Sequence, residues 1–294
     1  MSEERFTCVL EVAAMQGGGK ASSNPTHEHA AVFNRQAACR YGQMLFNVND
    51  AYIGRSLDLY GEFSEGEMEL FRQIVQPGHT VLDIGANIGT HALFFARQVG
   101  ADGKVLAFEP QRVVFQTLCA NMALNNVLNA WCFAHAVGAE PGEIFVPVLD
   151  FARAGNFGGL GLGQHHAGER VPVVTVDSLN LPKCNLIKID VEGMEHAVLS
   201  GARRTLARFR PFLYVENDRR DRASELVCLL DELDYVMYWH CPPLFNPKNY
   251  RNNPENMFGN TVSVNMFCAH RSVPIQMVGT RMVEVPRRSA ANVT

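Results

Sequence analysis

The feature that most constrains the fold is the stretch from residue 81 to residue 96, where a strand pattern turns into a helical one. Residues 81–84 are mostly apolar and β-prone without regular alternation, as in a parallel strand that is covered on both faces. From Ile88 onward, apolar residues recur at helical spacing. Gly85 and Gly89 bracket the reversal, and residues without a Cβ allow a tight turn. The pattern predicts a strand, a glycine turn and a helix that packs back onto the sheet.

This turn offers groups of both charges to a ligand. Asp83 at the end of the strand suits an ammonium group, and the free N–H groups at the start of the following helix suit a carboxylate. Such a pair fits the amino-acid end of S-adenosylmethionine. A dinucleotide site is the alternative, but its Gly-x-Gly-x-x-Gly fingerprint differs from the Asp-x-Gly-x-x-x-Gly spacing found here.

The next two strands extend the same site. Residues 104–110 form a buried strand that ends on Glu109, and an acid in this position of a doubly wound sheet can accept both hydroxyls of a ribose. Residues 131–138 form the third strand, whose end borders an adenine. His135 in this strand either touches the ring or fills space. The order of these strands therefore favours an adenosine-containing ligand.

A second strand, turn and helix occupies residues 186–199. Asp190 and Glu192 lie at the carboxyl end of this fourth strand, which is expected beside the first strand at the switch point where open α/β sheets bind ligands. The fifth strand, residues 212–217, again ends on polar side chains. Acids are thus predicted to gather at one edge of the sheet.

The remaining segments show weaker patterns. Residues 30–47 are partly helical in pattern, and Ser64 followed by Glu67 predicts a capping box at a helix start. Residues 144–148 and 171–176 predict a hairpin-like insert around a mobile, glycine-rich loop. The last two strands are expected at 235–240 and 261–268, as an antiparallel edge pair.

Five segments occur in the order typical of a known family: 81–89, 108–110, 174–179, 188–193 with Glu195, and 215–217. With them the chain resembles the FkbM family of class I, S-adenosylmethionine-dependent methyltransferases. The resemblance implies an α/β, Rossmann-like fold with a seven-stranded, mostly parallel sheet, an antiparallel edge strand and helices on both faces. It also implies O-methylation of a hydroxyl on a sugar, glycolipid or polyketide-type small molecule.

Length and composition limit the possible architecture. A chain of 294 residues, of which 47% are hydrophobic, can bury a full core. We expect an N-terminal extension over 1–55, a methyltransferase domain over 56–270 and a C-terminal tail over 271–294.

Charge and cysteine content limit the kinds of partner and compartment that are expected. The net charge of −4 gives no basic field that would favour nucleic acid. The eight cysteines include no Cys-x-x-Cys pair, which is typical of reduced thiols in a cytoplasmic protein. No apolar run is long enough to span a bilayer. We expect a cytoplasmic protein with a small-molecule or carbohydrate hydroxyl acceptor, and whether it forms a homo-oligomer stays open.

The residues expected to bind the cofactor come from the strand ends, the glycine turn and one segment near its mouth. They are Tyr60, Asp83, Gly85, Ala86, Asn87, Gly89, Thr90, His91, Glu109, Pro110, His135, Ala136 and Asp190.

Several mechanisms fit these residues. An alcohol acceptor must lose a proton, and Asp190 or Glu192 is the expected base, ahead of His196. In a second version, Asp190, Glu216 and Asn217 hold Mg²⁺, an arrangement similar to that of catechol O-methyltransferase. A third hypothesis is a protein that binds S-adenosylmethionine or S-adenosylhomocysteine without catalysis.

Overall fold

The computed structural model describes residues 32–163, 165–219, 223–276 and 283–285. The chain divides into two compact units, residues 1–32 and 33–294. Most of the predicted extension and much of the predicted tail lie outside the described residues, so the expected boundaries at 55 and 271 stay predictions.

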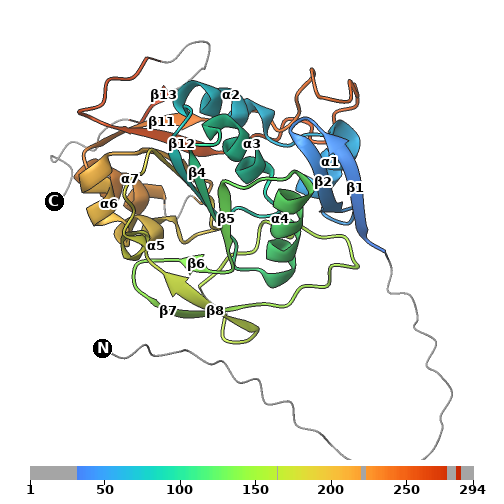
Figure 1. Cartoon of the computed structure of the whole chain (residues 1–294), viewed down its shortest axis with the longest axis horizontal. Coiled ribbons are helices and arrows are strands. Elements are labelled where there is room, and N and C mark those ends of the chain that lie inside the picture. Colours follow the sequence, from blue (N-terminus) through green and yellow to red (C-terminus); the bar gives the residue numbers. More distant parts are fainter. Residues whose placement is uncertain (1–31, 164, 220–222, 277–282, 286–294) are drawn as a thin grey trace, which may run out of the picture. The chain divides into compact units, whose positions relative to one another are not determined.

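A central sheet forms the middle of the second unit (Figure 1). Its strand order is β13-β11-β12-β10-β9-β3-β4-β5. The parallel strands are β3 (Thr80–Ile84), β4 (Lys104–Phe108), β5 (Ala130–Phe133), β9 (Leu186–Ile189) and β10 (Phe212–Glu216). The antiparallel strands are β11 (Tyr235–His240), β12 (Asn265–His270) and β13 (Val283–Glu284). The expected α/β fold with a mostly parallel sheet is confirmed.

The expected number of seven strands is wrong by one. The described sheet has eight, because the two-residue strand β13 pairs with β11 at the edge. The expected antiparallel pair, β11 and β12, is confirmed. A two-residue strand leaves no periodic signal in the sequence, which is why the pattern did not reveal it.

Helices cover both faces of the sheet, which explains why its strands are apolar runs without alternation. One core lies under α2 (Glu65–Ile74), α3 (Thr90–Val99) and α4 (Arg112–Leu124), and it includes Val81 of β3. The other lies under α5 (Glu195–Ser200), α6 (Arg203–Phe209) and α7 (Ala223–Glu232), and it includes Leu82 and Ile84. Among the described helices, none is long and apolar enough to cross a bilayer.

The partly helical pattern expected over residues 30–47 is wrong. The described part of this segment is a hairpin of β1 (Asn34–Cys39) and β2 (Gly42–Asn47), followed by α1 (Ile53–Tyr60). In β2 the buried residues Met44 and Phe46 are two apart, which is the period of a strand.

The capping box expected at Ser64 is also absent from the structure. Ser64 precedes α2 with a φ of 53° and makes no side-chain cap hydrogen bond. Glu67 instead turns into the protein, where its carboxylate bonds to His91 and Asn265. The buried partners outcompete the local N–H groups of the helix start, and the sequence pattern alone could not show them.

The third expected strand divides into β5 and β6 (Ala136–Val137), which belong to different sheets. β6 pairs with β8 (Glu169–Val174), and β8 pairs with β7 (Gly142–Val146). The antiparallel β7–β8 pair confirms the expected hairpin-like insert. The first part of the connection between β7 and β8, residues 147–163, is called the insert loop below. A short 3₁₀ helix, η1 (Val176–Leu179), leads from β8 toward β9.

Candidate active site

Many of the expected site residues lie at or just after the carboxyl ends of β3, β4, β9 and β10, which are neighbours in the central sheet. From β3 the chain proceeds to β4 and β5 on one side, and it later returns to β9 and β10 on the other. This arrangement creates a switch point beside β3, the place where open α/β sheets bind ligands.

The glycine turn is tightly fitted against the β9 end. Gly85 has a φ of 80°, and a Cβ added there would lie 1.7 Å from the carbonyl oxygen of Asp190. The N–H groups of Gly85 and Ala86 donate to the carbonyl of Phe108 at 3.0 and 2.9 Å. Gly89, with a φ of 89°, precedes α3, which begins at Thr90. A side chain at position 85 is therefore excluded by both backbone conformation and space.

Glu109 is brought to this turn as expected. Its side chain is buried, and its two oxygens accept from the N–H groups of Asn87 at 3.0 Å and Gln111 at 2.9 Å. Burial raises the pKa of Glu109 to about 7, although these N–H groups oppose the shift. Each carboxylate oxygen has a second acceptor position, so Glu109 can still accept ribose hydroxyls.

Asp83 lies deeper than expected. It is 0% exposed, and neither of its carboxylate oxygens has a hydrogen-bond partner among the described residues. Its nearest cation is the Nζ of Lys188, 3.7 Å away, and Lys188 also donates to Asp190 at 3.1 Å. Burial raises the pKa of Asp83, and the charge of Lys188 opposes this. Lys188 is a site residue that the sequence reasoning missed, although a lysine within the apolar run of β9 was a visible signal.

Two other expected cofactor residues have hydrogen-bond partners within the protein. The Nε2 of His91 lies 3.0 Å from Glu67, whose other oxygen accepts from Asn265 at 3.1 Å. The hydroxyl of Tyr60 donates to the carbonyl of Glu255 at 2.8 Å. Both side chains are buried, so the structure gives them a clear packing role.

A narrow apolar slot lies beside the turn. It is lined by Gly85, Pro110, His135 and Ala136, which were all expected at the cofactor, and by Leu162 of the insert loop. The slot encloses only about 10 Å³, and the Nδ1 of His135 is buried without a hydrogen-bond partner in the described chain.

The insert loop passes over this region. The carbonyl of Phe157 accepts from the side chain of Gln111 at 2.7 Å. A Cβ at Gly158 would lie 2.7 Å from the side-chain nitrogen Nδ2 of Asn87. The loop therefore packs on the glycine turn, and its Leu162 lines the slot, which at about 10 Å³ is too small for a planar ring unless one of its walls moves.

Three acids meet on the other side of the crevice. Carboxylate oxygens of Asp190, Glu192 and Glu216 all lie within 4.8 Å of one another. Burial raises the pKa of Glu192 to about 7, with the charge of Asp190 adding to it, while Arg219 opposes the shift by donating to Glu192 at 2.8 Å. Burial and the charges of Asp190 and Glu192 raise the pKa of Glu216 to about 11. Its Oε2 is buried and has no hydrogen-bond partner in the described part of the protein.

The turn that carries Asp190 and Glu192 is held by Glu195. The carboxylate of Glu195 accepts from the N–H groups of Gly193 at 2.9 Å and Val191 at 3.3 Å. Glu192 has a φ of 54° and Gly193 a φ of 105°. Glu195 therefore fixes an unusual backbone conformation that presents the Glu192 side chain.

A polar cavity of about 230 Å³ opens beside the acids, between α5 and α7. Its lining includes Glu216, Asn217, Arg219 and the exposed His196. Asn217 donates to the sulfur of Met266 at 3.4 Å. Of the expected base candidates, His196 lines the cavity itself, whereas Asp190 and Glu192 approach it through Glu216. Two residues of the expected metal set, Asp190 and Glu216, come close together, and Glu192 joins them.

Known sequences resemble this chain over its central half. The profile of the methyltransferase FkbM domain matches residues 83–237. Methyltransferase 1 of Beauveria bassiana is 29% identical over 143 residues, which cover 41% of this chain and 57% of that protein. The hexuronic acid methyltransferase AglP of Haloferax volcanii is 29% identical over 151 residues, which cover 51% of this chain and 59% of that protein. The matches thus span less than two thirds of either relative.

Solved structures also resemble the chain. The methyltransferase FkbM of Methylobacillus flagellatus aligns with 68% of this chain and 50% of its own, at 17% identity and a TM-score of 0.43. The fibrillarin of Aeropyrum pernix, in complex with S-adenosylmethionine, aligns with 83% of this chain and 85% of its own, at 11% identity and a TM-score of 0.42.

Proposed function

This chain belongs to the FkbM methyltransferase family, and we propose that it transfers the methyl group of S-adenosylmethionine to a hydroxyl group of a sugar or similar small molecule. The observation that carries the proposal is the carboxylate of Glu192, which lies within 4.8 Å of Glu216 in the wall of a polar cavity of about 230 Å³ and whose pKa is raised to about 7. The relative AglP is named for a hexuronic acid, a sugar that bears hydroxyl groups.

The residues around the glycine turn fit the donor. Gly85 allows the tight turn against the β9 end, and Glu109 retains acceptor positions for ribose hydroxyls. The slot beside Pro110 and His135 offers apolar walls for an adenine ring, and the orphaned Nδ1 of His135 offers a polar partner. S-adenosylmethionine would supply a methyl group already activated by its sulfonium.

The protein's own task is to position the acceptor and remove its proton. Glu192 is the base in this proposal, because a pKa near 7 leaves a large fraction of it ionised at neutral pH while it can still hold a proton. Asp190 is already engaged by Lys188 and has an orienting role. His196 is exposed in the cavity wall and would contact the acceptor rather than the reacting oxygen.

Calorimetry with S-adenosylmethionine, S-adenosylhomocysteine and NAD⁺ tests the donor. We expect the first two to bind, and Glu109→Ala to weaken both at least tenfold, while the exposed Glu140→Ala leaves them unchanged. Binding of NAD⁺, or no binding of either sulfur ligand by folded protein, would refute the proposal. A screen of neutral pyranosides and uronates, read by release of S-adenosylhomocysteine, then tests the acceptor. A protein that binds the donor but methylates none of them would favour the non-catalytic alternative.

A divalent cation is a second candidate component. The unpartnered Glu216 oxygen and the close approach of Asp190 and Glu192 favour Mg²⁺, which prefers oxygen ligands. In this version the cation lowers the proton affinity of the acceptor hydroxyl. We expect Mg²⁺ to raise the melting temperature of wild type but not of Glu216→Gln. Activity that survives EDTA, with no shift in melting temperature, would exclude the cation.

A further inference from the structure

A buried polar layer lies between the sheet and the α2–α3 pair. Asp83 of β3 and Lys188 of β9 are register partners on neighbouring strands, and Lys188 is also the register partner of Tyr214 in β10. Paired residues of adjacent strands point to the same face, so these three side chains share one face of the sheet. Two positions earlier, Val81 and Leu186 occupy that face in the apolar core. The face therefore changes from apolar to polar toward the ligand end.

Lys188 connects a fully buried acid to one that reaches the crevice. Its side chain is 3% exposed, with Nζ 3.1 Å from Asp190 and 3.7 Å from Asp83. The side chain of Asp83 is 0% exposed, whereas that of Asp190 is 40% exposed. Of the two carboxylates, only Asp190 can meet a ligand without rearrangement.

The charges that face Lys188 keep it an ammonium ion. Burial alone would favour the neutral amine, but the charges of Asp190, Asp83 and Glu67 raise the pKa of Lys188 above its ordinary value. Further polar groups in this layer include His91 of α3 and Asn265 of β12, which are both bonded to Glu67, and Tyr214 of β10, which is bonded to His240 at 2.9 Å.

Asp190 also lies at the turn where the amino-acid end of the donor is expected. Its carbonyl oxygen fills the space that a Cβ of Gly85 would need. Its Oδ2 accepts from Lys188, which leaves Oδ1 and further acceptor positions open. An ammonium group that approaches the Gly85 turn would therefore reach Asp190 before the buried Asp83.

We propose that Asp190 receives the ammonium group of the cofactor, and that Asp83 and Lys188 are positioning residues that act through it. This inference rests on the proposed function. Asp83 holds the Lys188 ammonium from behind, and Lys188 holds the carboxylate of Asp190 in place. The inference reassigns Asp83, which the sequence pattern predicts as the direct ligand of the ammonium.

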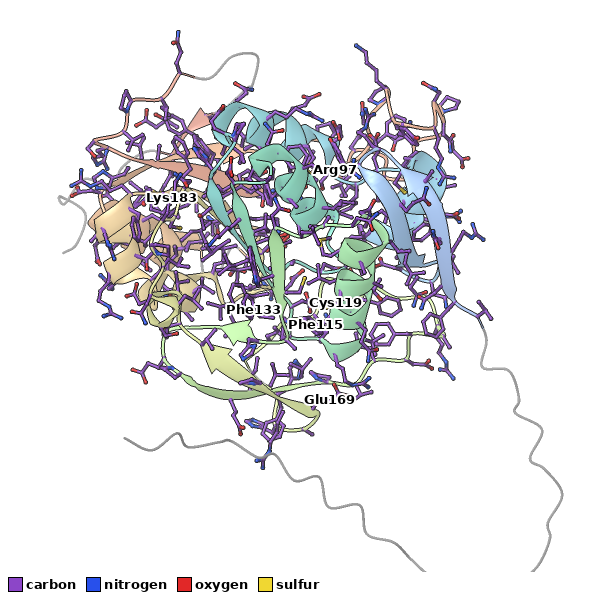
Figure 2. All side chains as sticks on the ribbon, in the orientation of Figure 1. Arg97, Phe115, Cys119, Phe133, Glu169 and Lys183 are labelled. Carbon is purple, nitrogen blue, oxygen red and sulfur yellow. The ribbon has the colours of Figure 1, made fainter. Side chains whose placement is uncertain are left out.

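Two probes separate these roles by calorimetry. S-adenosylhomocysteine carries the amino-acid end, whereas 5′-methylthioadenosine lacks it. We expect Asp190→Asn to weaken the binding of S-adenosylhomocysteine at least tenfold and that of methylthioadenosine less than twofold. Lys188→Met should weaken the first probe at least fivefold, and Lys188→Arg, which keeps the charge, less than threefold. The control is Lys183→Met, a change to an exposed lysine that is labelled in Figure 2 and donates only to the carbonyl of Gly78 at 2.9 Å.

A double-mutant cycle decides between direct and indirect action of Asp83. We expect Asp83→Asn to weaken S-adenosylhomocysteine three- to fivefold in wild type and less than twofold when Lys188 is already methionine. The inference would be overturned if Asp83→Asn weakened the binding of S-adenosylhomocysteine, but not of methylthioadenosine, equally with and without Lys188. Asp83 would then be the direct ligand of the ammonium group. If the variants lost affinity equally for both probes, Asp83 and Lys188 would have only a structural role.

Lys188→Arg keeps the charge and Asp83→Asn nearly keeps the shape of the side chain, so these two variants are the ones expected to fold. If Lys188→Met does not fold, Asp83→Asn and Lys188→Arg are compared by the ratio of their affinities for S-adenosylhomocysteine and methylthioadenosine. Direct binding of the ammonium by Asp83 predicts that Asp83→Asn changes this ratio at least tenfold. Indirect action of Asp83 predicts a smaller change. Wild type that binds methylthioadenosine and S-adenosylhomocysteine equally contradicts the inference alone. Wild type that binds neither contradicts the proposed function as well.

Discussion

At the scale of single residues, three carboxyl groups near the crevice differ in proton affinity because their surroundings differ. Glu109 and Glu192 have pKa values raised to about 7, and Glu216 has one raised to about 11, with burial as the largest cause in each. Only Glu192 combines such a pKa with a position among the acids beside the cavity. This combination distinguishes Glu192, the proposed base, from its neighbours.

Glu192→Gln tests that role. We expect the turnover number to fall by about 100-fold or more, the usual contribution of a general base, while the affinity for S-adenosylhomocysteine changes less than threefold. In wild type the rate should rise with pH through about 7, because the ionised carboxylate is the active form. Steady-state kinetics with an acceptor found in the screen measure both, with Glu140→Gln as control. A variant with normal turnover would remove Glu192 from the mechanism.

Much of the candidate site follows from residue spacing. Gly85, Glu109, Asp190 and Glu192 all come directly after predicted strands, and parallel strands bring their carboxyl ends to one edge. The role of Lys188 could not be predicted in this way, because it depends on the register between β3 and β9. Register is fixed by packing across strands that are distant in sequence.

At the scale of elements, the strand-to-helix turn at Gly85 holds the two halves of the site together. Gly78 offers a matched comparison, since its φ of 77° is close to the 80° of Gly85, but a Cβ there would meet nothing within 4 Å. Alanine at both positions separates the effect of backbone conformation from that of the contact with Asp190.

We expect Gly78→Ala to lower the free energy of unfolding by about 1 kcal/mol, the typical cost of a left-handed conformation for a residue with a Cβ. Gly85→Ala should lower it by at least about 2 kcal/mol more, because the β9 end must also shift. Urea unfolding of both variants measures the difference. Equal losses would show that the contact with Asp190 has no energetic weight.

Element type was predictable where the pattern was clear and failed where it was weak. The 80–108 region reads clearly as strand, helix and strand, although β3 and β4 have only five residues each. β1 and β2 were misread because β1 is mostly exposed and the apolar residues of β2 are consecutive, so neither strand shows a clear alternation. Ser64 and Glu67 match a capping box in sequence, but the buried partners of Glu67 come from α3 and β12. Tertiary contacts decided that case, and no local pattern contains them.

At the scale of the whole molecule, the raised carboxyl pKa values make stability depend on pH. The folded protein binds these protons more tightly than the unfolded chain, whose glutamates titrate near the ordinary value of 4.5. The contribution of these groups to stability is therefore present at low pH and is lost as pH rises from about 4.5 through 7, and for Glu216 at still higher pH.

We expect the free energy of unfolding to fall between pH 5.5 and pH 8, and Glu216→Gln to reduce that fall by about 2 kcal/mol. This is below the roughly 3 kcal/mol that 2.5 pH units would allow, because the neighbouring acids share the protons. Urea titrations at the two pH values, with Glu140→Gln as control, provide the measurement. A wild-type protein that gains stability over this range would contradict the assigned proton affinities.

The arrangement of the strands also bears on how such proteins diverge. Glu109 and the slot-lining Pro110 and His135 follow β4 and β5, whereas the acids and the polar cavity belong to β9, β10 and the segments after them. In the proposed arrangement Asp190, at the end of β9, belongs with the donor residues, whereas the cavity is formed by α5, the end of β10 and α7. Changes in the segments that follow β10 are therefore expected to alter the acceptor cavity and to leave the residues proposed to hold the methyl donor unchanged.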